Sequence, residues 1–181
     1  MRIRTAFLLG IGMLLAAPAR PEGAAEAAAA YAVPKQSLTL VAARRVIEAC
    51  EAEARRRGVG VVSVVVDAGG HVIQLSRMDE AQVASVEVGI GKARTAAIFR
   101  RPSRVFEEQI RSGRVAALAL AGATPLQGGI PIAIDGVVVG AIGVSGDTPQ
   151  IDEDIAIAGA NALAPRALAV TGRGDPGGER R

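Results

Sequence analysis

Residues 128–146 read GGIPIAIDGVVVGAIGVSG, and the predicted sheet is centred on them. Two apolar, β-branched runs are separated here by Asp135 and Gly136. Asp-Gly between such runs is typical of a two-residue type I′ turn, because both turn residues need a positive φ. Glycines stand at both open ends of this predicted hairpin. They allow the backbone to approach either a ligand or another segment of the chain closely.

A second hairpin is predicted upstream of the first. The β-branched run 60–66 is followed by turn residues at 67–70 and by an alternating run at 71–76. The segment 115–121 is ambiguous, because its alternation favours a strand and its alanine content favours a helix. We favour a short strand, which brings the expected sheet to about five strands.

Apolar residues recur at helical spacing in four further segments. These are 40–57, 82–100, 103–111 and a helix of about fourteen residues that begins at Pro149. Thr39, Ser103 and Thr148 are expected to cap three of these helices, and Gly58 is expected to end the first. Val83 is expected on the buried side of the second. This order of helices and hairpins predicts an α+β fold, with helices packed on an antiparallel sheet.

The first nineteen residues are typical of a secretory signal. Arg2 and Arg4 precede an apolar run at 6–17 that is short for a membrane span, and small residues follow at 17–19. We therefore expect 1–19 to be a signal peptide and the protein to be periplasmic or secreted, with no membrane contact after cleavage. An uncleaved membrane anchor is the alternative.

Composition divides the remainder into three parts. Residues 20–37 are expected to form an alanine-rich linker, 38–164 the folded domain, and 165–181 a disordered tail rich in Gly, Arg, Asp and Glu. Cys50 is the single cysteine, so no intrachain disulfide can form. It lies on the apolar stripe of the first helix, which predicts a buried structural thiol.

The composition also argues against nucleic acid as a partner. The chain has one Tyr, three Phe and no Trp, too few aromatic rings for base stacking. Its formal net charge is only +3, and the basic residues are spread along the chain rather than clustered.

Histidine occurs once, at His71. Two roles are open for it: a core residue on the same face as Ile73 and Leu75, or a ligand of haem iron through its neutral imidazole. Met78 is either a core residue or a second soft ligand. One histidine and one cysteine do not make a zinc site, and Ser145 lacks the G-x-S-x-G spacing of a nucleophile elbow.

Several charged residues have both a structural and a functional interpretation. Asp79 could cap the following helix while Arg77 faces an anionic group. Lys92 either lies on a solvated helix face or points at a carboxylate or a haem propionate. The acidic first turn of the last helix, 152–154, complements the helix dipole or holds a metal or acid–base group. The Gly128–Gly129 backbone could cradle a carboxylate or an oxyanion.

Several ordered motifs together resemble one family. They are LTLVAARRVIEACEAEARRRGVGVVSVVVDAGGHVIQLSRMDEA at 38–81, KARTAAIFRRPS at 92–103, the hairpin at 128–146, and DEDIAIAGANAL at 152–163. Together they resemble the haem-binding or haem-degrading family typified by GlcG and HbpS, to which the C-terminal domain of PduO-type proteins is similar. The resemblance implies an α+β domain, assembly into homo-oligomers, and haem or another small ligand as the cargo.

The resemblance also marks ligand-site residues. The positions that match the recurrent polar or glycine positions of the family are Arg77, Met78, Asp79, Lys92, Thr95, Gly128, Gly129, Asp152 and Glu153. They leave two hypotheses. The first is an exported haem-binding protein that promotes haem breakdown, with His71 or Met78 on the iron and Arg77 or Lys92 on the propionates. The second is an enzyme acting on a small oxygenated or carboxylic metabolite, with the Gly-Gly backbone as anion site and Lys92, Asp79 or Glu153 moving a proton.

Overall fold

The hairpin predicted at 128–146 is present in the computed structural model, which describes residues 31–163. It consists of β3 (Gly129–Ile134) and β4 (Val137–Ser145). Asp135 has φ 51° and Gly136 has φ 79°, so both turn residues take the positive φ that the Asp-Gly pair predicts. Within the described residues, the helices and strands between residues 40 and 161 belong to one unit that begins at Gln36.

The sheet has four strands in the order β2-β1-β4-β3, and every neighbouring pair is antiparallel. The second predicted hairpin supplies β1 (Val62–Asp67) and β2 (Val72–Arg77). The central strand β1 is buried on both faces, whereas β2 and β3 lie at the edges. The edge position of β3 accommodates Pro131, which has no N–H to donate to a further strand.

The expected fifth strand was wrong. Residues Val115–Ala119 form a short 3-10 helix, η1, instead. Its turns are closed by local bonds, with Ala117 N–H donating to the Arg114 carbonyl at 3.1 Å. Only Ala117 is buried, so the alternating residues have no sheet face to cover, and the alanine-rich segment takes the local hydrogen bonds.

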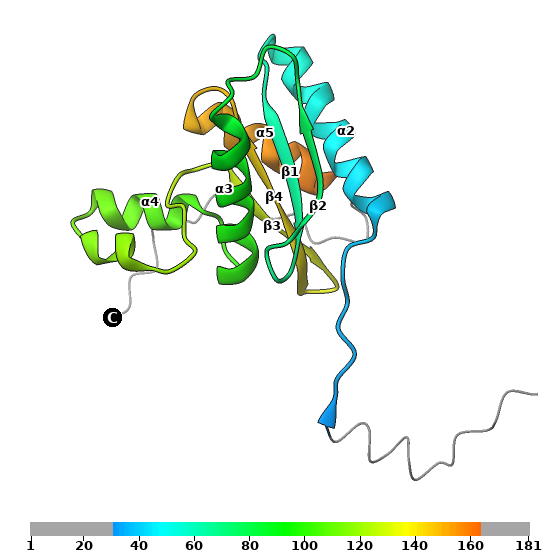
Figure 1. Cartoon of the computed structure of the whole chain (residues 1–181), viewed down its shortest axis with the longest axis vertical. Coiled ribbons are helices and arrows are strands. Elements are labelled where there is room, and N and C mark those ends of the chain that lie inside the picture. Colours follow the sequence, from blue (N-terminus) through cyan, green and yellow to red (C-terminus); the bar gives the residue numbers. More distant parts are fainter. Residues whose placement is uncertain (1–30, 164–181) are drawn as a thin grey trace, which may run out of the picture. The chain divides into compact units, whose positions relative to one another are not determined.

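Helices cover both faces of the sheet (Figure 1). The face with α2 (Leu40–Arg57) and α5 (Pro149–Asn161) holds the larger core, which includes Val46, Val65, Ile130, Ile142 and Ile155. The opposite face packs Val62, Val64 and Val66 against the alanines Ala93, Ala96 and Ala97 of α3 (Ser85–Phe99). α3 packs on β4, β3 and β1. Fewer residues are buried on this face than on the other, and most of them are alanine or valine, so the core is smaller here.

The ends of α2 and α5 follow the predicted chemistry. The Thr39 hydroxyl accepts from Ala42 N–H, and Gly58 closes α2 in the left-handed conformation. The Thr148 hydroxyl accepts from Ile151 N–H, and Pro149 begins α5. Cys50 is buried against α5, and its thiol donates to the Ile155 carbonyl at 3.5 Å; burial raises its pKa to about 12.

Three expectations about the middle helices were wrong. α3 starts at Ser85 rather than near 82, so Val83 lies outside it and is 79% exposed. Asp79 does not cap α3, because it lies well upstream of Ser85, the first helical residue. Ser103 precedes α4 (Arg104–Arg111) but makes no side-chain capping bond. Within residues 31–163, no helix is both long and apolar enough to cross a membrane.

Candidate functional site

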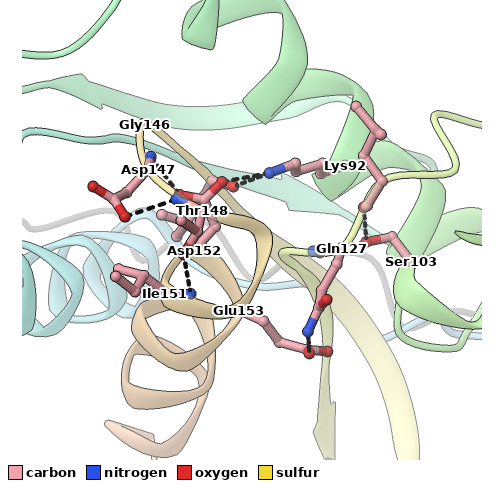
Figure 2. Close-up of polar contacts among 12 residues, drawn as sticks. Lys92, Ser103, Gln127, Gly146, Asp147, Thr148, Ile151, Asp152 and Glu153 are labelled. Atoms are coloured by element: carbon pink, nitrogen blue, oxygen red, sulfur yellow. Dashed lines mark hydrogen bonds and ion pairs between the residues drawn. The ribbon is translucent and has the colours of Figure 1, made fainter.

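Lys92 and Asp152 form a buried ion pair between two helices. Lys92 Nζ lies 2.7 Å from Asp152 Oδ2 and also donates to the Val144 carbonyl at 3.0 Å. The two side chains are only 4% and 3% exposed. Since α3 and α5 cover opposite faces of the sheet, this pair joins the two helical layers where β4 ends (Figure 2). Lys92 therefore does not lie on a solvated helix face. It points at a carboxylate, as the other interpretation predicted, and this carboxylate belongs to the same chain.

Gly128 and Gly129 make room for this bridge. Gly128 has φ 121°, and a Cβ placed on it would lie 2.9 Å from Lys92 Nζ and 2.8 Å from the Val144 carbonyl oxygen. A Cβ on Gly129 would lie 2.2 Å from the Lys92 carbonyl oxygen. Both glycines therefore bring the backbone against another segment of the chain, which is one of the two roles their position allows.

Ser103 has a role that the sequence did not indicate. Its hydroxyl accepts from Gly129 N–H at 2.8 Å and donates to the Leu126 carbonyl at 2.6 Å. The Gly129 N–H that the enzyme hypothesis assigned to an oxyanion is thus satisfied within the protein. Only a serine followed by a helix is visible in the sequence, and that pattern predicts a cap rather than a contact 26 residues away.

Glu153 lies beside the bridge, where it binds α4 and the loop before β3. Gln127 donates to Glu153 Oε2 through its side-chain amide, and Arg104 Nε lies 3.2 Å from Glu153 Oε1. Figure 2 shows the Gln127 contact next to the Lys92–Asp152 pair. Glu107 accepts from Gln127 N–H at 2.7 Å, so one glutamine joins two carboxylates.

Burial dominates the electrostatics of both acidic residues. It raises the pKa of the Asp152 carboxyl, against the opposing effect of the Lys92 ammonium and of the Asp147 N–H that donates to it at 3.0 Å. It also raises the pKa of the Glu153 carboxyl, against the opposing effect of Gln127 and Arg104. Asp152 and Glu153 lie near the N-terminus of α5, where the helix dipole favours negative charge. In addition, Asp152 accepts a hydrogen bond from Lys92, and Glu153 accepts one from Gln127.

Thr95 is buried one helical turn beyond Lys92. Its hydroxyl donates to the Gly91 carbonyl at 2.8 Å and accepts from Thr124 N–H at 2.7 Å. It therefore ties the loop before β3 to α3, in the same way as Ser103 ties that loop to α4.

His71 lies apart from this cluster and is not a core residue. It sits in the β1–β2 turn, just before β2, and its side chain is 84% exposed. Asp67 Oδ1 accepts from Gly69 N–H at 2.8 Å and from His71 N–H at 3.0 Å, and it lies 3.4 Å from His71 Nδ1. These backbone bonds, with that of His71 first, lower the pKa of the Asp67 carboxyl, so it stays ionised beside the imidazole. Of the two roles left open for His71, that of a core residue on the same face as Ile73 and Leu75 was wrong, because His71 lies in the turn before β2 begins at Val72.

Met78 and Asp79 lie at the other end of β2. With Glu80, Arg55 and residues 58–60 they line an open hollow of about 380 Å³ at the C-terminal end of α2. Met78 packs on the α2–α5 core, so it is a core-packing residue. The length of β2, about 20 Å, separates His71 from Met78, so the two side chains cannot reach the same iron within one subunit. Arg77 is exposed.

The predicted site residues thus fall into separate places. Lys92, Gly128, Gly129 and Asp152 form one cluster, with Thr95 and Glu153 beside it. Within residues 31–163, no three His, Cys, Asp or Glu side chains gather as metal ligands.

Comparison with protein families and curated proteins gives consistent matches. The family described as haem-degrading protein HbpS-like matches residues 38–161. Protein GlcG of Escherichia coli K12 is 40% identical over 103 residues, which cover 57% of this chain and 77% of GlcG. An uncharacterised 15.0 kDa protein from the dhaT–dhaS intergenic region of Citrobacter freundii is 36% identical over 124 residues, or 66% of this chain and 87% of that protein.

Solved structures share the fold. A double mutant of Streptomyces reticuli HbpS has a TM-score of 0.69 at 30% identity and covers 82% of this chain and 97% of its own. Klebsiella pneumoniae ORFY has a TM-score of 0.69 at 31% identity, over 72% of this chain and 93% of its own. The haem complex of PduOC, at 24% identity and a TM-score of 0.66 over 74% and 98% of the two chains, shows the fold alone. The chain therefore belongs to the HbpS-like family of haem-degrading proteins.

Proposed function

We propose that this protein binds haem and that His71 is the iron ligand. Two observations support the proposal. The chain belongs to a family described as haem-degrading, and the crystal structure of a fold relative, PduOC, is that of its haem complex. The observation that carries the choice of ligand is the exposed His71 imidazole beside an ionised carboxylate, Asp67.

The Asp67–His71 pair suits iron binding. A carboxylate within 3.4 Å of Nδ1 favours the tautomer with its proton on that nitrogen. Nε2 is then left with its lone pair, which is the form that ligates a metal. Because the side chain is 84% exposed, a large planar group can reach it. Haem held there would supply the redox chemistry of its iron, and Asp67 would hold the imidazole in the ligating orientation.

Lys92 as a propionate partner and Met78 as an iron ligand are less well placed for contact with haem. Lys92 is engaged with Asp152 and the Val144 carbonyl in the interior, so it does not reach a propionate. Met78 packs against the core between α2 and the sheet, and ligating iron would require it to leave that packing.

The proposal extends to location and assembly. We propose that the protein is exported, on the basis of Arg2, Arg4, the apolar run and the small residues at 17–19, all of which lie outside the described residues. We also propose that it forms homo-oligomers and that it promotes the oxidative breakdown of the haem it binds, as the family description suggests.

A haem titration of the full chain tests the central proposal. Haemin is added to the parent protein, His71→Ala and Met78→Ala, and the Soret band is followed. We expect saturable binding with a shifted band in the parent and in Met78→Ala, and loss of that shift in His71→Ala. The absence of a saturable Soret band in the parent would refute haem binding. Loss of the shift in Met78→Ala alone would refute the assignment of His71 as the iron ligand.

A further inference from the structure

We infer that the haem held by His71 lies on the α2 side of the sheet and that Arg44 of α2 binds its propionates. This inference rests on the proposed haem binding and extends it to residues with no assigned role. The surface concerned is named the α2–β2 corner here, and it consists of Leu40, Arg44, Asp67, His71 and Ile73.

The alternation of β1 places Asp67, and with it His71, on the α2 side. Val64 and Val66 pack against α3, whereas Val65 between them belongs to the core under α2 and α5. Successive side chains of a strand point to opposite faces, so Asp67 is on the same face as Val65. Asp67 Oδ1 lies 3.4 Å from His71 Nδ1, and the imidazole is therefore on the α2 side as well.

α2 begins at the same end of the sheet as this pair. A Cβ placed on Gly140 would lie 2.5 Å from Leu38 Cδ1, and Gly140 is the strand partner of Asp67. Leu38 stands two residues before Leu40, the first residue of α2. The N-terminal end of α2 is therefore close to Asp67, on the face that carries His71.

α2 and β2 run side by side in the same direction. Further along both elements, Ser76 Oγ donates to Glu51 Oε1 at 2.6 Å, which aligns the helix with the strand. Arg44 precedes Glu51 by seven residues, or about 10.5 Å and two turns, so both are on one side of α2. About 10 Å along β2 leads back from Ser76 to Ile73. Arg44 is therefore level with the start of β2, beside the turn that carries His71.

Arg44 is suited to bind a carboxylate of a ligand. It is exposed, and the ion pairs that α2 makes within residues 31–163 involve Arg55, Arg56 and Arg57 instead. The Cα–Cβ bonds of a helix tilt toward its N-terminus, which for Arg44 is the direction of His71. A guanidinium binds a carboxylate through two parallel hydrogen bonds, which favours arginine as a propionate partner.

Leu40 and Ile73 give the corner an apolar component. Leu40 stands one turn before Arg44 on the same side of α2 and is 46% exposed. Ile73 is half-buried and packs against the core under α2 and α5. The corner thus combines an imidazole beside a carboxylate, an apolar surface and an arginine. An apolar, planar, dianionic ligand that is ligated through its metal fits this combination.

Neighbouring residues of α2 provide matched controls for haemin titration of the full chain. Arg45 and Val41 each lie about 100° further round the helix than Arg44 and Leu40, on its outer surface. Arg44→Gln is therefore compared with Arg45→Gln, and Leu40→Glu with Val41→Glu. Each variant is titrated with haemin and with its dimethyl ester, which has no propionate charges.

We expect Arg44→Gln to raise the Kd for haemin by about tenfold and to leave that for the dimethyl ester unchanged. Leu40→Glu should raise the Kd for both porphyrins by about tenfold or more, because it places a charge against the ring. Arg45→Gln and Val41→Glu should bind both porphyrins like the parent, within about twofold.

Equal haemin Kd values for Arg44→Gln and Arg45→Gln would overturn the inference, while a Soret shift that depends on His71 would still support haem binding. Absence of haemin binding by the parent would instead overturn the proposed function itself.

A structural role of Arg44 is tested on the same variants. Arg44→Lys keeps the positive charge and should recover part of the haemin affinity that Arg44→Gln loses. Because Arg44 is exposed, the urea unfolding midpoint of Arg44→Gln and its mass by light scattering should match those of the parent without haemin. An equal loss of affinity for haemin and for its dimethyl ester in Arg44→Gln would show that this arginine supports the fold or a subunit contact, and the inference would fail.

Discussion

The two regions with chemically active side chains differ in one respect that decides their roles. In the interior, Lys92 and Asp152 are 4% and 3% exposed, and each binds groups of the same chain. At the β1–β2 turn, His71 is 84% exposed, and its side chain is positioned by one carboxylate. Buried polar groups must be satisfied internally, whereas an exposed and oriented imidazole can serve a ligand. The difference indicates that family-matched polar residues can be structural.

Breaking the interior bridge should have the largest effect. Lys92→Met leaves Asp152 buried without its cation and should lower the free energy of unfolding by about 3–5 kcal/mol. Adding Asp152→Leu should recover much of the loss, because a well-packed apolar pair has no desolvation cost. Urea unfolding measures both, and Lys35→Met, at an exposed lysine, is the control. If the free energy of unfolding of Lys92→Met equals that of the parent, the ion pair does not hold the two helical layers together.

Removal of the Ser103 hydroxyl should have the next largest effect. Ser103→Ala leaves Gly129 N–H without its acceptor in a buried place, which should cost about 1–3 kcal/mol of unfolding free energy. Ser112→Ala removes an exposed hydroxyl bond to Gln109 and should change the value by less than about 0.5 kcal/mol. Equal losses in the two variants would contradict the anchoring role of Ser103.

Glu153 makes the interior sensitive to pH. Its pKa is raised in the folded protein, so the native state keeps a proton that the unfolded state releases. This contribution to stability is complete below pH 4.5, the ordinary value, and is lost as the pH rises through the raised value. We expect Glu153→Gln to gain stability relative to the parent across this window, by about 1.4 kcal/mol for every pH unit that separates the folded and unfolded pKa values of Glu153.

The measurement is urea unfolding at several pH values between about 4 and 8, a range that brackets the ordinary and raised values. Glu48→Gln, on the exposed surface of α2, is the control. Its free energy of unfolding should change with pH with the same slope as that of the parent. A parent that gains stability relative to Glu153→Gln as the pH rises would show that the Gln127 and Arg104 contacts, rather than burial, dominate this carboxyl.

His71 should have the smallest effect on stability. Because its side chain is exposed, His71→Ala should change the free energy of unfolding by less than about 0.5 kcal/mol. Thermal and urea unfolding without haem provide the measurement. A loss of about 2 kcal/mol or more would mean that the Asp67–His71 contact holds the turn together, and the contrast with Lys92 would disappear.

The fold could be predicted where local signals suffice. The Asp135–Gly136 turn, the Thr39 cap and the Gly58 terminus each depend on neighbouring residues, and each was confirmed. The segment at 115–119 was not, because its local pattern favours two structures and only packing decides between them.

The site was harder to predict because its contacts are long-range. Lys92 and Asp152 are 60 residues apart, and Ser103 and Gly129 are 26 apart, so spacing along the chain does not reveal them. Four of the residues that the family pattern marked as ligand-site candidates lie together at the bridge, namely Lys92, Gly128, Gly129 and Asp152. The family pattern could not separate structural residues from ligand-binding ones, since both recur for physical reasons.

Resonance Raman spectroscopy of the ferrous haem complex tests the central claim most directly. The chain contains one histidine, so an iron–imidazole stretching band can only come from His71. We predict that this band is present in the parent and absent in His71→Ala, while Lys92 and Asp152 remain paired in both. A saturated haem complex of the parent without an iron–imidazole band would contradict the account, because the exposed histidine would then not be the ligand.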